Sequence, residues 1–185
     1  MEGMEIEARF ADLDHAEIEQ KLVAAGARRT RNSFFREWVF ALPEWRKDHR
    51  RVRVRTDGTT TWLTYKANKT WAVDSTEEIE VEVSSADDAS ELIRAIGIPL
   101  ERYQEKKRIS YGIGDIIFDL DTWPKIPPVL EIEAPSEEKV KEGAALLGLD
   151  WKDAIFIDQK VLHRERYGVD LDDIAEYRFD PAPGA

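Results

Sequence analysis

Charged residues at every second position are the feature of this sequence with the clearest chemical content. The alternation is densest in the segments EIEAR at 5–9, RVRVR at 51–55 and EIEVEV at 78–83. Successive side chains of a β-strand point to opposite faces, so residues two apart share a face. Each segment is therefore expected to form a strand with charges on one face and apolar side chains on the other.

Shorter stretches of the same kind occur elsewhere in the chain. They place charges at Lys66, Lys106, Arg108, Asp119, Asp121, Glu131 and Glu133. A single strand of this type is most simply explained by an antiparallel sheet with one solvated face. The whole set favours another interpretation, because nearly every position is fully charged and the signs are sorted by strand. A site that holds a polyanion together with a metal ion would require such sorting.

The residue types fit that chemistry. Carboxylates are hard oxygen ligands suited to Mg²⁺ or Mn²⁺, which bind through a few carboxylates plus phosphate oxygens. Arginine offers a planar fork that matches phosphate geometry, and lysine adds a mobile point charge. Buried charges without partners are prohibitive, so the acids and bases of such a site are expected to pair with one another when it is empty.

Composition narrows the class of protein. The chain has 185 residues and 42% hydrophobic content, which suits one domain with a real core. Its net charge of -11 disfavours broad binding to nucleic acid, although a local cluster of cations can still hold a phosphate ligand. There is no cysteine, no signal-peptide pattern and no apolar stretch of membrane-spanning length. We therefore expect a cytoplasmic protein that binds neither nucleic acid nor membrane.

The periodicity predicts an α+β chain that is mainly β. Strands are expected at 4–10, 34–42, 51–56, 60–67, 77–83, 103–111, 115–122 and 129–134. Helices are expected at 14–25, 86–96, 136–147 and 152–167. Because hairpin-linked strands dominate, the expected architecture is a closed antiparallel β-barrel with a charged lumen and with helices packed outside. Residues 1–168 would form this domain and residues 169–185 a loose C-terminal tail.

An ordered series of segments resembles the CYTH superfamily, the triphosphate tunnel metalloenzymes. It comprises EIEAR at 5–9, RVRVR at 51–55, LTYK at 63–66, EIEVEV at 78–83, EKKR at 105–108, FDLD at 118–121 and LEIEAPSEEKV at 130–140. The superfamily includes class IV adenylyl cyclases, thiamine triphosphatases and inorganic triphosphatases. The resemblance implies an eight-stranded antiparallel tunnel, Mg²⁺ or Mn²⁺, and a ligand such as ATP, thiamine triphosphate or tripolyphosphate. Family members are often dimers, so a homodimer is left open.

The resemblance also implies roles for individual residues. The metal-side acids would be Glu5, Glu7, Glu131 and Glu133, with Glu80, Glu82 and Asp119 as further candidates. The phosphate-binding bases would be Arg51, Arg53, Arg55, Lys66, Lys106 and Arg108. Arg9, Glu131 and Glu133 are the catalytic candidates.

Two positions depart from the family pattern. Arg9 stands where the ExExK motif ends in lysine, and Val39 stands where a tyrosine usually precedes the proline. In some family triphosphatases that lysine and tyrosine are thought to activate the attacking water, whereas arginine is a poor base and valine has no proton chemistry. The sequence therefore leaves three functions open: a class IV-like adenylyl cyclase, a triphosphate phosphohydrolase, and a sensor that binds a nucleotide or polyphosphate without turnover.

Overall fold

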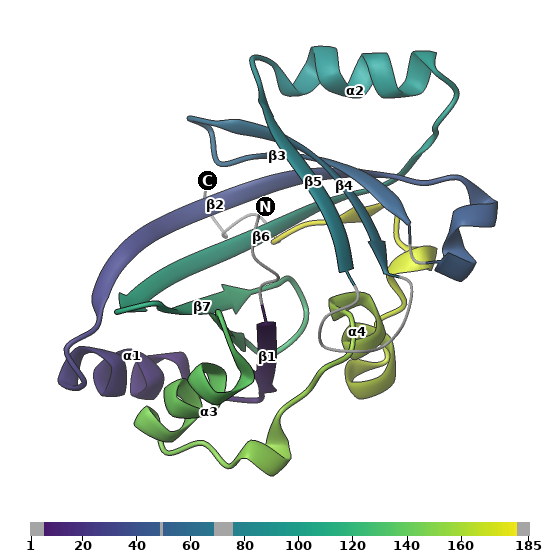
Figure 1. Ribbon diagram of the computed structural model, residues 1–185. Helices are drawn as coiled ribbons and strands as arrows, with labels where there is room; N and C mark the ends of the chain where they lie inside the picture. The colour runs from purple at the N-terminus through teal and green to yellow at the C-terminus, as the bar shows by residue number, and fades with distance from the viewer. Residues whose placement is uncertain (1–5, 49, 69–75, 181–185) are drawn as a thin grey trace. The chain divides into compact units, whose positions relative to one another are not determined.

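The computed structural model describes residues 6–48, 50–68 and 76–180 (Figure 1). These residues fall into two compact units. The first unit contains the described residues 6–33 and 107–157, and the second contains the described residues of 34–68, 76–106 and 158–180.

The described residues form nine strands and four α-helices, most of them close to the predicted ranges. The strands are β1 Ile6–Ala11, β2 Arg28–Phe40, β3 Arg51–Thr56, β4 Thr61–Asn68, β5 Thr76–Val83, β6 Leu100–Ile113, β7 Ile116–Thr122, β8 Val129–Ala134 and β9 Glu176–Tyr177. The helices are α1 His15–Ala24, α2 Ala86–Ala95, α3 Glu137–Leu146 and α4 Gln159–Tyr167. Three short 3-10 helices are η1 Pro43–Asp48, η2 Trp151–Asp153 and η3 Leu171–Asp173.

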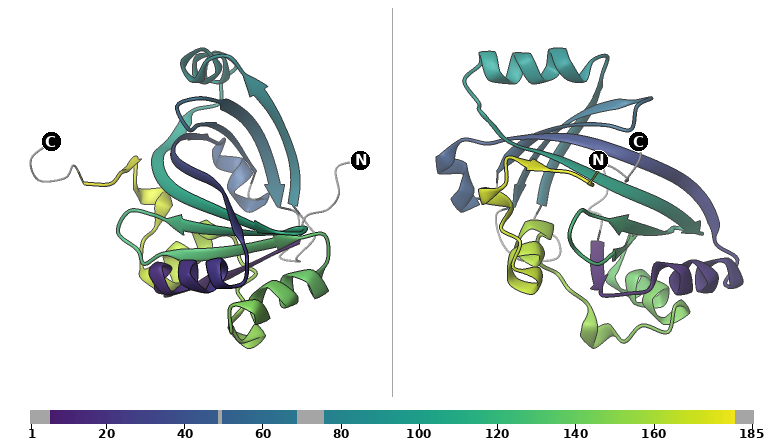
Figure 2. Two further views of the ribbon diagram at one scale, coloured as in Figure 1. Left: turned by 90° about the vertical axis from the view of Figure 1, so that its left-hand side faces the viewer. Right: turned by 180° about the vertical axis from the view of Figure 1, so that it is seen from behind.

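The first unit is a run of antiparallel strands in the order β1-β8-β7-β6 (Figure 1). One face of these strands is apolar and packs on helices α1 and α3, which lie beside the strands in both views of Figure 2. Phe10, Phe118 and Ile132 represent the strands in this core, and Leu22 and Val140 represent the helices. The apolar residues are those that alternate with the charges, as the period-two pattern predicts.

The second unit continues with β6, β2, β3, β4 and β5 in that order, and the short β9 pairs in parallel with β6. Its apolar face is covered in part by α2, where Ala89 and Ile93 pack with Phe40 and Val54. The predicted β3–β4 hairpin is confirmed: Gly58 has φ 91, and the Asp57 carboxylate accepts hydrogen bonds from the backbone of the loop. Such left-handed backbone favours glycine.

Strand order in each unit has two ends, so neither unit by itself is a closed barrel. The antiparallel α+β architecture is therefore confirmed, while the closure of the predicted barrel is not shown. None of the described helices combines the length and the apolar character needed to cross a bilayer.

The last helix is shorter than predicted. Residues 152–158 were expected to belong to it, but α4 begins only at Gln159, after the Asp158 side chain caps its first turn. Ile155 instead exchanges two backbone hydrogen bonds with Arg9, at 3.0 and 2.9 Å. This long-range bridge satisfies the backbone of the segment in an extended form, which the local pattern could not reveal.

The C-terminal segment carries secondary structure where a loose tail was expected. Within residues 169–180, η3 is followed by β9, and Tyr177 of β9 is fully buried. The backbone oxygen of Leu171 accepts a hydrogen bond of 2.9 Å from Arg102. Strand β2 also begins earlier than predicted, at Arg28, because its first residues continue the pairing with β6.

Candidate functional site

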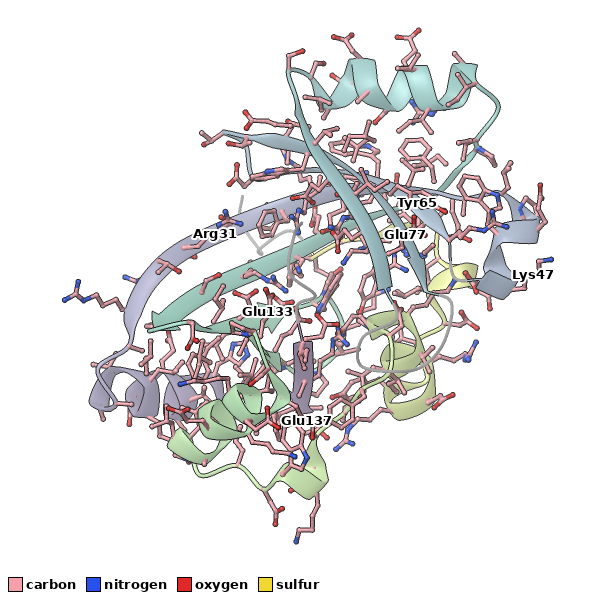
Figure 3. The ribbon with its side chains drawn as sticks, in the orientation of Figure 1. Arg31, Lys47, Tyr65, Glu77, Glu133 and Glu137 are labelled. Atoms are coloured by element: carbon pink, nitrogen blue, oxygen red, sulfur yellow. The ribbon has the colours of Figure 1, made fainter. Side chains whose placement is uncertain are left out.

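Three carboxylates converge on strands β7 and β8 of the first unit. Asp119 lies opposite Glu131 in the β7–β8 ladder, and Glu133 follows two residues later on the same face. One oxygen from each of the three lies within 4.8 Å of the others. Figure 3 labels Glu133 on this part of the sheet. Hard oxygen donors at this spacing suit a divalent cation such as Mg²⁺ or Mn²⁺.

Arg108 of β6 neutralises part of this acidic group. Its Nε and Nη2 atoms donate to the two oxygens of Asp121, both at 2.6 Å. The same guanidinium donates to Asp119 and lies 3.4 Å from Glu131. Burial by itself lowers the pKa of Arg108, but the three carboxylates outweigh it and raise the pKa well above its usual value. Arg108 is thus a permanently charged, tightly held partner of the acids.

Arg9 of β1 is the second arginine on this face. Its Nη2 atom lies 2.5 Å from Glu7 and 3.0 Å from Glu131, and Nη1 donates to the backbone oxygen of Ile157 at 3.0 Å. The backbone bridge between Arg9 and Ile155 fixes the strand beside these contacts. A guanidinium held in this way can bind an anion but cannot act as a general base.

These residues form what we call the acid–arginine cluster. Its members are Glu7, Arg9, Arg108, Asp119, Asp121, Glu131 and Glu133. Burial raises the pKa of Asp119, and the opposing charge of Arg108 does not cancel that effect. The donor set fits a divalent metal ion, because excess negative charge remains after both arginines are paired.

A second group of charges lies on β3, β4 and β6 of the second unit. This cation cluster consists of Arg51, Arg53, Arg55, Lys66 and Lys106. In the β3–β4 ladder Arg51 lies opposite Lys66 and Arg53 opposite Thr64, so the positive charges share one face. Acids come from the neighbouring strand β5, where Glu78 lies opposite Lys66 and pairs with it at 2.6 Å.

Arg53 and Arg55 are held much less tightly than the arginines of the first unit. Arg53 lies 3.7 Å from Glu37, 3.8 Å from Glu80 and 4.0 Å from Glu78. Arg55 lies 3.5 Å from Glu80. Only 14% and 13% of the two arginine side chains is exposed, so neither can be fully hydrated. Two buried cations with long contacts to their acids retain donors for an incoming anion.

Glu37 of β2 is the buried acid of the second unit. Its Oε2 accepts a hydrogen bond of 2.5 Å from Gln104, and its carboxylate lies opposite Arg55 in the β2–β3 ladder. Burial by itself raises the pKa of Glu37, but Arg53, Lys106, Arg55 and Gln104 outweigh it and lower the pKa to about 2. Burial lowers the pKa of Arg53 to about 10, against the opposing charge of Glu37. Both remain ionised at neutral pH.

Aromatic rings support the cation cluster. The Arg55 guanidinium lies 4.9 Å from the ring centre of Phe35 and 5.3 Å from that of Trp62. The Lys106 ammonium lies 5.7 Å from the Phe35 ring. Trp62 lies opposite Arg55 in the β3–β4 ladder, so its side chain shares the charged face. These contacts fix the cations on desolvated ring faces.

Comparison with known proteins gives the family. The model of the CYTH domain matches residues 3–151. The chain belongs to the CYTH family. No curated protein matches the CYTH chain at a significant level.

Solved structures share the fold of this CYTH domain. PH1012 from Pyrococcus horikoshii OT3 is 24% identical, with a TM-score of 0.74 over 84% of this chain and 96% of that one. A candidate adenylate cyclase from Vibrio parahaemolyticus is 14% identical, with a TM-score of 0.75 over 88% and 98% of the two chains. HpAC1 from Hippeastrum, a candidate adenylyl cyclase for which a dominant triphosphatase activity is reported, is 14% identical, with a TM-score of 0.63 over 90% and 97%. Identities this low show the fold alone.

The structure assigns the remaining predicted residues of the CYTH domain to different surroundings. Glu5 lies outside the described residues. Glu80 accepts a hydrogen bond of 2.7 Å from Thr64 and pairs with the arginines of the cation cluster, and Glu82 is exposed opposite Trp62. Neither belongs to the carboxylate group that could hold a metal. Val39 is buried opposite Arg53, so the position of the usual tyrosine does lie on the charged face.

Glu37, Gln104 and Asp121 are site residues to which the sequence analysis gave no role. Asp121 was noted only as part of the charge alternation, yet it holds Arg108 more closely than Glu131 does. Glu37 lies in the segment FFREWVF, where aromatic side chains obscure the alternation. Counting back two residues from Val39 would have placed Glu37 on the charged face.

Proposed function

We propose that this CYTH domain is a metal-dependent enzyme that acts on a triphosphate, either as a class IV-like adenylyl cyclase or as a triphosphate phosphohydrolase. The observation that carries the proposal is the state of Arg53 and Arg55. Both are nearly buried, yet their acids lie 3.5 to 4.0 Å away. A ligand of high negative charge density would supply closer acceptors for these guanidinium groups.

Asp119, Glu131 and Glu133 are the residues that would hold Mg²⁺ or Mn²⁺. The bound ion would supply Lewis-acid chemistry, neutralising the charge that develops on phosphate oxygens during bond cleavage. Glu131 and Asp119 already accept contacts from Arg9 and Arg108. The two arginines therefore share these oxygens with any divalent ion that would bind there.

The cation cluster would position the triphosphate. Arg53 and Arg55 present guanidinium forks for phosphate oxygens. Lys66 adds a single positive charge, which is paired with Glu78 in this structure. Both candidate reactions break a phosphoanhydride bond through stabilisation of negative charge and alignment of the attacking oxygen. The pairing of cations with aromatic rings keeps these donors in place before the ligand arrives.

Proton transfer distinguishes this chain from family triphosphatases that use the lysine and tyrosine. Arg9 is a permanently charged ion-pair partner, and Val39 is a buried hydrocarbon. A carboxylate of the acid–arginine cluster would then have to accept the proton. This replacement favours cyclisation of ATP, or hydrolysis in which one of these carboxylates takes the proton of the attacking water.

Binding without turnover is the second candidate function. It is supported by the tight ion pairs of Arg9, which leave no general base at the end of the EIEAR motif. A sensor of this type would use the same cations and acids to recognise a nucleotide or polyphosphate.

One assay distinguishes the cyclase, the phosphohydrolase and the sensor. The purified protein is incubated with ATP, thiamine triphosphate and tripolyphosphate, each with Mg²⁺ or Mn²⁺, and the products are resolved. Cyclic AMP with pyrophosphate identifies a cyclase, and released orthophosphate identifies a phosphohydrolase. Metal-dependent binding without product identifies the sensor, and absence of binding to any of the three ligands would overturn the proposal.

A further inference from the structure

Glu37 stands in an unusual electrostatic position. Its side chain is fully buried on β2, and the charges that act on it most strongly are Arg53, Lys106 and Arg55. Other acids near these cations are much more accessible, because Glu78 and Glu80 are 36% and 32% exposed. A buried carboxylate acts on neighbouring charges far more strongly than an exposed one, since water screens it less.

The contacts of Glu37 with the cations are electrostatic and lack ideal hydrogen-bond geometry. Its Oε2 is bonded to Gln104 at 2.5 Å, whereas Oε1 lies 3.7 Å from Nη1 of Arg53. Within the part of the chain that the structure describes, Oε1 of Glu37 and the Nε atoms of Arg53 and Arg55 are buried without a hydrogen-bond partner. The side-chain amide of Gln104 therefore holds the Glu37 carboxylate in place. The carboxylate offsets the positive charge of the arginines but does not occupy their hydrogen-bond donors.

We propose that Glu37 is the resident counter-charge of the anion site, which keeps Arg53, Arg55 and Lys106 assembled when no ligand is present and limits how tightly a polyphosphate binds. The inference rests on the proposed function, because it concerns the same anion site. Glu37 is a positioning residue in this account, since it acts through the cations and donates no hydrogen bond to the ligand.

Removing the negative charge of Glu37 should have opposite effects on stability and on ligand affinity. Without Glu37, the buried cations would repel one another in the ligand-free protein, which would destabilise the fold. The same loss would make the site more positive, which would favour a polyanion. Removing a residue that only supports the fold would lower both stability and affinity. Lower stability combined with higher affinity therefore identifies Glu37 as a counter-charge. An upper limit on affinity would also help a negatively charged product to leave.

The experiment measures the binding of tripolyphosphate by calorimetry and the thermal unfolding of the ligand-free protein. We expect Glu37→Gln to lower the melting temperature and to bind tripolyphosphate about tenfold more tightly than the wild type. Glu37→Asp keeps the charge and is expected to lower stability while leaving affinity within about twofold of wild type. Glu91→Gln removes the same formal charge from an exposed position on α2, and it is expected to change neither quantity appreciably.

Gln104→Glu provides the opposite change, should Glu37→Gln fail to fold. A second carboxylate beside Glu37 is expected to weaken tripolyphosphate binding about tenfold. Tighter binding by Glu37→Gln, or weaker binding by Gln104→Glu, supports the inference. Affinity that falls together with stability in Glu37→Gln, or stays unchanged in both variants, overturns the inference and leaves the proposed function intact. A wild-type protein that does not bind tripolyphosphate at all overturns both.

Discussion

Arginine occurs in two distinct states on the charged faces of this CYTH domain. Arg108 donates two hydrogen bonds of 2.6 Å to Asp121, whereas Arg53 lies 3.7 to 4.0 Å from the carboxylates with which it pairs. The short, bidentate geometry is that of a buried structural ion pair. The long contacts are those of a cation whose donors are still available. The same residue type thus has a structural role at Arg108, whereas at Arg53 we propose a role in ligand binding.

Removing each arginine should therefore have a different consequence. Arg108→Gln leaves Asp119, Asp121 and Glu131 without their central cation, and we expect it to lower the free energy of unfolding by about 3–5 kcal/mol. Mg²⁺ or Mn²⁺ should restore part of that stability, because the ion can replace the missing charge among the same carboxylates. The measurement is chemical unfolding with and without the metal.

Arg53→Gln is the matched control for this prediction. It should destabilise less, gain no stability from the metal, and bind tripolyphosphate at least about tenfold more weakly than wild type. Equal destabilisation of the two variants, or a metal effect on both, would contradict the division of the arginines into two states.

Glu37 gives the protein a specific acid sensitivity. Its pKa is lowered from 4.5 to about 2 in the folded state, so its ionised form stabilises the fold above pH 4.5. The contribution, about 3 kcal/mol, is lost as the pH falls from 4.5 toward 2, because the unfolded chain binds the proton first. Urea unfolding measured across this window should show a steeper loss of stability for wild type than for Glu37→Gln. Parallel pH profiles of the two proteins would show that Glu37 is not the group responsible.

Strand pairing turns single charges into clusters. The ladder of β7 and β8 places Asp119 opposite Glu131, and the ladder of β3 and β4 places Arg51 opposite Lys66. A side-chain period of two fixes which residues share a face, but the partner across the ladder depends on register. The strands therefore decide which charges meet, and the helices α1, α2 and α3 cover the opposite, apolar faces.

The difference between the face of a strand, which is a local property, and its pairing partner, which is not, explains what the sequence could predict. Alternation in segments such as RVRVR and LEIEA was enough to place their charges on one face, and the ladders confirm it. The start of α4 could not be predicted, because Ile155 finds its hydrogen bonds on Arg9, far away in the sequence. Glu37 was missed for another reason, since a single acid among the aromatic residues of β2 carries no visible alternation.

Strand β9 makes the C-terminal segment a part of the second unit's core. Tyr177 is fully buried, and its ring packs edge-on against His163 of α4, with 5.6 Å between the two ring centres. We expect Tyr177→Ala to lower the free energy of unfolding by about 3–5 kcal/mol, as for other large aromatic side chains. Glu176→Ala changes the exposed neighbouring residue and should have an effect below about 1 kcal/mol. Thermal unfolding compares the two, and similar small losses in both would mean that the segment contributes little to the fold.

At the scale of the whole molecule, the two units carry complementary chemistry. The first holds the acids that suit a divalent ion, with Arg9 and Arg108 as their partners, and the second holds Arg53 and Arg55, whose long contacts with acids suit phosphate binding. A triphosphate in water travels with a divalent ion, so its recognition needs both kinds of group. This arrangement also reconciles a net charge of -11 with the proposed binding of an anion, because several cations lie on the neighbouring strands β3 and β4.

The central claim is our proposal that this CYTH domain binds a triphosphate together with a divalent ion. Calorimetric titration of the wild-type protein with tripolyphosphate, in the presence and absence of Mg²⁺, tests it most directly. The account predicts that Mg²⁺ raises the affinity for tripolyphosphate at least about tenfold, and that Glu131→Gln abolishes this enhancement while metal-free binding persists. Tripolyphosphate affinity that is undetectable under both conditions, or that is identical with and without Mg²⁺, would contradict it.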